Sequence, residues 1–121
     1  MTTTGDLILW FDERLEASRE RAAWLRADSR GDDAVLESVR GNVFRMFGAM
    51  FQVAARLGEN EPEPSRLLFM DRAEPFTAKW ADAREKAETH GDAKTAVTER
   101  LKSDTLAEIF ARVDALGRDG T

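Results

Sequence analysis

The sequence predicts an all-α fold, a bundle of four to five helices, from three observations. All three prolines fall between residues 62 and 75, outside the long stretches on either side. Apolar residues recur at helical spacings of three and four along most of the chain, and no stretch shows the strict alternation of a half-buried strand. With 121 residues, the chain has the size of one domain and can bury its own core.

The N-terminal half predicts an antiparallel hairpin of two long helices. The first helix is expected over residues 6–27. Asp32 or Asp33 then caps a long central helix, about 33–57, because short acidic side chains accept hydrogen bonds from the free N–H groups of a first turn. Gly58 is expected to end this helix.

The middle of the chain predicts a linker and a further helix. Residues 59–64 are acidic and contain two prolines, and a short helical turn is expected over 65–70. Pro75 suits the first turn of the next helix, since its missing N–H has no intrahelical partner there. His90 and Gly91 are expected to close that helix.

The last segment is expected to start at the N-cap Asp92 and to run to residue 116. Its apolar residues change sides part-way along, with Val97 and Leu101 nearly opposite Leu106, Ile109, Val113 and Leu116. Because one straight amphipathic helix does not fit this pattern, we favour a break near Ser103, where a capping-box spacing follows. One helix that contacts two different neighbours is the alternative. Residues 117–121 are expected to form a disordered tail.

The central helix is predicted to be the centre of the fold. It carries a strict heptad seam, formed by Leu36, Val39, Val43, Met46, Met50, Val53 and Leu57. A second stripe lies beside it, formed by Phe44, Phe47 and Phe51. Gly41 and Gly48 recur on the other side of this helix. Either they allow another helix to approach closely, or they are simply exposed, in which case each destabilises the helix by about 1 kcal/mol relative to alanine.

The first helix also has two apolar stripes. Its core face consists of Leu7, Phe11, Leu15, Ala22 and Leu25. Trp10 and Trp24 lie on its flank, where they either anchor a partner or form the edge of the monomer's own core. Since two neighbouring helices are apolar over so much of their circumference, a homodimer is expected to cover the excess surface, with Trp10, Trp24, Gly41 and Gly48 as candidate interface residues.

Composition excludes several classes of function. The chain holds 18 Lys and Arg residues against 23 Asp and Glu residues, and a net charge of −5 argues against a nucleic-acid surface. Without cysteine it has no disulfide, no thiolate metal site and no thiol nucleophile. The start of the sequence lacks the basic region of a signal peptide, and no apolar run is long enough for a membrane span. We therefore expect a cytoplasmic protein without cofactor, metal or membrane contact.

Motifs for catalysis are sparse. Glu13 and Glu16, like Glu85 and Glu88, have a spacing that resembles the Mg-binding pairs of all-α nucleotide pyrophosphohydrolases. Helical periodicity nevertheless places both pairs opposite the apolar stripes, which favours a solvated surface. The single histidine, His90, lies at a helix end, where the helix dipole stabilises it. No catalytic residue is predicted.

Charged residues within apolar faces are the remaining candidates for a site. Arg14 and Arg21 lie between the two stripes of the first helix, and Arg40 lies in the apolar arc of the central helix. Neighbouring guanidinium groups require an anion, and Asp104 and Glu108 are candidates to supply it as ion pairs inside the bundle. The alternatives are an external carboxylate or phosphate held by forked hydrogen bonds, or solvated heads on packed stems.

These patterns predict a non-catalytic bundle that acts through helix-mediated protein–protein contacts, as a self-associating adaptor or regulator. The alternative function is a small-molecule sensor that binds an anion with its buried arginines.

Overall fold

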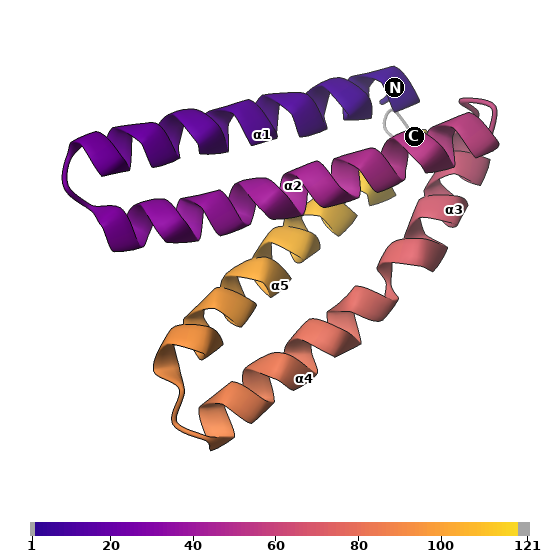
Figure 1. Cartoon of the computed structure of the whole chain (residues 1–121). Coiled ribbons are helices and arrows are strands. Elements are labelled where there is room, and N and C mark those ends of the chain that lie inside the picture. The colour runs from indigo at the N-terminus through magenta and orange to yellow at the C-terminus, as the bar shows by residue number, and fades with distance from the viewer. Residues whose placement is uncertain (1, 119–121) are drawn as a thin grey trace.

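The computed structural model of the chain describes residues 2–118 (Figure 1). The predicted all-α bundle is confirmed, with five helices in the described part of the chain: α1 (Thr4–Ala27), α2 (Gly31–Leu57), α3 (Pro62–Ala73), α4 (Pro75–Thr89) and α5 (Ala93–Asp114). None of these helices combines the length and the apolar character that a membrane span requires.

The helices form a hairpin and an arm that returns to it. In Figure 1, α1 and α2 run side by side and antiparallel, as predicted, and α3 and α4 lead away from the end of α2. α5 runs back beside α4 and passes behind α2, so that the end of the described chain comes back to its start. There the backbone N–H of Gly117 donates to the carbonyl oxygen of Thr2 at 3.1 Å. Of the predicted tail, residues 119–121 lie outside the described residues.

α1 starts two residues before its predicted position because Thr3 and Asp6 cap each other. The Asp6 N–H donates to Thr3 Oγ1 at 3.1 Å, and the Thr3 N–H donates to Asp6 Oδ2 at 3.0 Å. This reciprocal pair satisfies two N–H groups that the first turn leaves free.

The predicted cap of α2 is wrong. α2 begins at Gly31, and Arg30 occupies the cap position, where its side chain accepts no hydrogen bond from a backbone N–H of the first turn. Asp33 instead accepts from Arg30, with 2.9 Å between Nε and Oδ2. Both acidic residues therefore lie inside the first turn, where the positive end of the helix dipole favours them.

The predicted linker is shorter than expected, because its prolines start a helix. α2 ends at Leu57, and Glu59 and Asn60 make the turn with left-handed φ values of 55° and 60°. α3 then starts at Pro62 and runs for 12 residues, where the sequence predicted only a short turn. Proline tolerates a first helical turn, since the N–H that it lacks would have no partner there.

α3 is tied to the end of α5 by a buried arginine. Arg66 donates to Glu63 on its own helix, and its Nη1 lies 3.7 Å from Asp114 Oδ1. The hydrogen bond from Arg66 lowers the pKa of Glu63 and raises the pKa of Arg66.

The boundaries of α4 and the start of α5 follow the prediction, but α5 has no break. Pro75 begins α4, and Asp92 caps α5 by accepting from the Thr95 N–H at 3.2 Å. α5 continues through Ser103 without interruption. The change of apolar side instead reflects one helix that contacts two different neighbours. The first half of α5 faces the tip of the hairpin, and the second half enters the core.

Phenylalanines form the centre of the core. Phe44, Phe47 and Phe51 of α2 are buried beside Phe11 of α1 and Phe69 of α3. The heptad seam of α2 is not the centre, since Val43 is the one seam residue that is buried. α1 covers one side of α2, and α3 and α5 cover another, so the buried arc is centred on the Phe stripe and the seam lies at its edge.

Candidate functional site

Arg14 and Glu108 form an ion pair that joins α1 to α5. Arg14 Nη2 donates to Glu108 Oε1 at 2.7 Å, and the guanidinium lies over the Phe44 ring, 5.3 Å from its centroid. The two side chains are 39% and 40% exposed, so this pair contributes about 1 kcal/mol or less to the free energy of unfolding. Its geometry is that of the ion pair within the bundle which the sequence analysis considered.

Arg21 of α1 and Arg40 of α2 line one cavity. The cavity has a volume of about 280 Å³ and lies between the tip of the hairpin and the first half of α5. Arg40 Nε lies 3.1 Å from Glu37 Oε2, and Arg21 lies over the Trp24 ring, 5.5 Å from its centroid.

Asp104 does not answer these arginines. Its Oδ2 lies 3.9 Å from Arg100 Nε on the same helix, and both side chains are exposed. Arg14 does not line the cavity of Arg21 and Arg40 either. The predicted cluster is therefore divided between two places in the bundle.

The two tryptophans differ in their surroundings. Trp10 packs edge-on against Phe11 and Phe44, with centroid distances of 5.0 and 5.7 Å, and so belongs to the edge of the chain's own core. Trp24 is 53% exposed and leaves an apolar surface at the hairpin tip.

Gly41 and Gly48 face α1 of the same chain. A Cβ at Gly41 would lie 3.3 Å from Ser18 Cβ, and one at Gly48 would lie 3.2 Å from Phe11 Cβ. The close helix–helix approach therefore occurs within the hairpin, and these glycines are not open to a second subunit. The sequence pattern placed them opposite the heptad seam, and in the structure α1 covers that side of α2.

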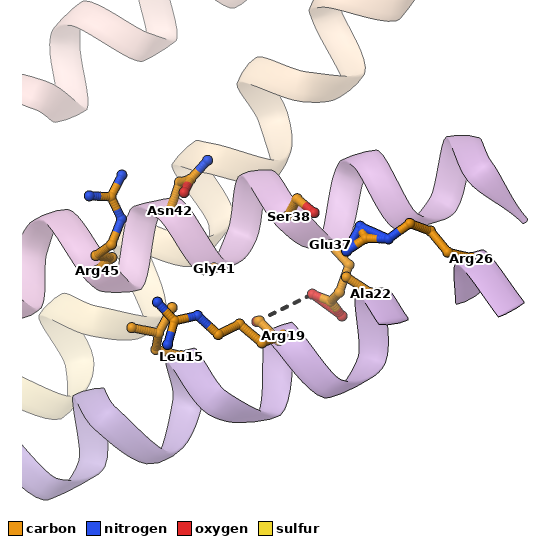
Figure 2. A pocket seen from close by; sticks show the side chains of 10 residues that line it. Leu15, Arg19, Ala22, Arg26, Glu37, Ser38, Gly41, Asn42 and Arg45 are labelled. Carbon is orange, nitrogen blue, oxygen red and sulfur yellow. Dashed lines mark hydrogen bonds between the residues drawn. The ribbon is translucent and has the colours of Figure 1, made fainter. Parts of the chain in front are cut away.

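A polar hollow of about 160 Å³ lies between α1 and α2 (Figure 2). The small residues Ala22 and Gly41 form its floor, and three arginines line it, Arg19, Arg26 and Arg45. Figure 2 shows Arg45 at one end, Arg26 at the other end near Glu37, and Arg19 reaching between them.

Among the described residues that line this hollow, Glu37 is the one with a carboxylate. Its Oε2 accepts a hydrogen bond of 3.4 Å from the Ser18 hydroxyl, drawn as a dashed line in Figure 2. The same oxygen lies 3.1 Å from Arg40 Nε. The negative charge of Glu37 is therefore shared with an arginine outside the hollow.

These three arginines were not predicted as site residues, because each occupies an exposed position. One signal was available: Arg19 and Arg26 are seven residues apart and so share a helix face. Arg45 joins them at the hollow only because of the register in which α1 and α2 pack, and helical periodicity does not predict that register.

A second, larger groove of about 650 Å³ lies where α3, α4 and α5 meet. Its apolar lining comes from Met70, Ala78, Ala81 and Phe110. Glu74 and Asp114 stand at its edge. Such a lining favours apolar groups.

Neither acidic pair that the sequence analysis considered forms a metal site. Glu13, Glu16, Glu85 and Glu88 are exposed. Within residues 2–118, no three His, Cys, Asp or Glu side chains are grouped closely enough to hold a metal ion. His90 is exposed at the C-cap of α4.

Comparison of the chain with known protein families, with curated proteins and with solved structures finds no match.

Proposed function

We propose that this chain is a non-catalytic bundle that works through helix-mediated protein contacts, and that its first partner is a second copy of itself. The proposal rests on an apolar stripe along α2 that residues 2–118 leave uncovered. Val35, Met46 and Leu57 on this stripe are 58%, 38% and 57% exposed. Val39, Met50 and Val53 between them are half-buried.

The stripe is uncharged and follows one line along the helix. Val35 and Leu57 stand eleven residues before and after Met46, which is about three helical turns in each direction. Val39 and Val53 stand seven residues before and after it, about two turns. Spacings of three, four and seven are those of a helix that packs along a partner helix.

This symmetry favours a second copy as the occupant. A two-fold axis through Met46 and perpendicular to α2 brings two stripes together in antiparallel orientation. It sets Val35 against the partner's Leu57 and Val39 against the partner's Val53, and it pairs Met46 with itself. An isologous interface of this kind is the usual one in homodimers.

The test is the molar mass in solution, measured by size-exclusion chromatography with light scattering over a range of concentrations. We expect the wild type to be a dimer and Met46→Lys to be a monomer, because the substitution places two like charges together on the axis. Leu67→Lys is the matched control, since Leu67 of α3 is 56% exposed and does not belong to the stripe.

Circular dichroism is expected to show the same helix content in all three proteins, because both substituted side chains are exposed. A wild type that stays monomeric at every concentration would refute the proposal. So would a Leu67→Lys variant that dissociates as fully as Met46→Lys.

A further inference from the structure

The hollow between α1 and α2 concentrates positive charge in a protein that is negative overall. Three arginines line it against one carboxylate, while the whole chain carries a net charge of −5. The carboxylate of Glu37 already accepts from Ser18 and lies beside Arg40. Because Arg40 competes for this single negative charge, the three arginines of the hollow remain in excess.

These arginines have few partners of their own. Among the residues that the structure describes, Arg26 and Arg45 have no carboxylate within ion-pair distance. Arg19 Nη1 lies 3.8 Å from Glu16 Oε2, and both side chains are 61% exposed, so this contact is weak. Three guanidinium groups around one hollow repel each other unless an anion lies between them.

Neutral donors complete the lining. The hydroxyl of Ser38 and the amide of Asn42 stand on α2 beside the arginines. Gly41 and Ala22 have side chains too small to fill the hollow. The backbones of α1 and α2 are nevertheless close together at Gly41. A volume of about 160 Å³ corresponds to roughly five waters at about 30 Å³ each. A phosphate group has five heavy atoms, so its size matches that of the hollow.

We propose that this hollow binds a single phosphate group, as inorganic phosphate or as the phosphate of a small ester. Guanidinium groups present pairs of N–H donors in the geometry that phosphate oxygens accept, and such charge-assisted hydrogen bonds are about twice as strong as neutral ones. The open mouth of the hollow leaves room for the organic part of an ester outside it. No residue of the α2 stripe lines this hollow.

Calorimetric titration with inorganic phosphate at constant ionic strength tests the site. We expect one phosphate per chain in the wild type, and we expect the dissociation constant to rise about tenfold or more in Arg26→Gln and in Arg45→Gln. Arg56→Gln is the matched control, because Arg56 is an exposed arginine on α2 that does not line the hollow. Its dissociation constant should equal that of the wild type.

Two further titrations sharpen the result. Glycerol 3-phosphate in place of phosphate identifies the source, since tighter binding of the ester means that groups outside the hollow contact it. Acetate should bind more weakly than phosphate, because it has fewer oxygens to accept from three arginines.

Three results would overturn the proposal. They are the absence of phosphate binding at millimolar concentration, equal binding of acetate and phosphate, and an equal loss of affinity in Arg56→Gln. Either of the last two results would show that phosphate binds only through the general positive charge of the surface and not at this hollow.

Discussion

At the scale of single residues, two glycines set the distance between α1 and α2. Gly48 faces Phe11, which is 3% exposed and packs against Phe51 and Phe69. Phe11 therefore has little space into which it can move when a group is added opposite it. Glycine is tolerated in the middle of α2, despite its poor helix propensity, because the contact with α1 requires it.

Replacing Gly48 with Ala should lower the free energy of unfolding by about 1–2 kcal/mol. The new Cβ would lie 3.2 Å from Phe11 Cβ, which outweighs the gain in helix propensity. Urea denaturation followed by circular dichroism measures the difference. Gly31→Ala is the control, since a Cβ there meets nothing within 4 Å, and it should leave stability unchanged or slightly raised. Equal effects of the two substitutions would contradict this account.

At the scale of elements, α5 shows how one helix serves two environments. Val97 and Leu101 lie over the tip of the hairpin, whereas Leu106, Ile109 and Val113 enter the Phe core. The helix can remain straight because its neighbours change along its length. Ser103 lies at this transition, and its buried hydroxyl has no hydrogen-bond partner within the described chain.

A proline at position 103 distinguishes a continuous helix from a broken one. Ser103→Pro should destabilise the protein by about 3 kcal/mol or more, because it removes a backbone hydrogen bond and its ring collides with the preceding turn. Ser103→Ala should be neutral or slightly stabilising, since alanine favours the helix and no hydrogen bond is lost. If the proline variant unfolds within about 1 kcal/mol of the alanine variant, α5 is interrupted there in solution.

At the scale of the whole molecule, one side chain of α3 connects the hairpin to the returning arm. The Phe69 ring lies 6.4 Å from Phe11, 5.7 Å from Phe51 and 6.4 Å from Phe110, centroid to centroid. These contacts reach α1, α2 and α5. The bundle should therefore unfold as one cooperative unit, because the hairpin and the returning arm share one core around Phe69.

Phe69→Ala should lower the free energy of unfolding by about 3–5 kcal/mol, the range for a buried Phe replaced by Ala. Phe76→Ala, which removes a half-buried ring of α4, should cost less. Thermal unfolding recorded both by far-ultraviolet circular dichroism and by tryptophan fluorescence tests cooperativity as well as stability. Two transitions in the wild type, or a larger effect of Phe76→Ala, would count against a single core centred on Phe69.

The candidate sites were predictable in part. Arg14 and Glu108 each stood out in the sequence as charged residues near apolar faces, but they are 94 residues apart and only the bundle brings them together. The arginine hollow was missed, because the spacing of Arg19 and Arg26 marks only a shared exposed face of one helix and does not point to Arg45 on another. What makes Arg19, Arg26 and Arg45 a group is the pairing of α1 with α2 over Gly41 and Ala22.

The sequence by itself determined the helical class, the hairpin and most helix ends. These depend on local physics, since the period of apolar residues, the proline of α4 and the cap at Asp92 act within a few residues of where they stand. Only the tertiary structure decided which arc of α2 is the core, which helix covers Gly41 and Gly48, and which stripe stays uncovered. A helix can show from its sequence that it has a wide apolar arc, but the positions of its neighbours determine which part of that arc is buried.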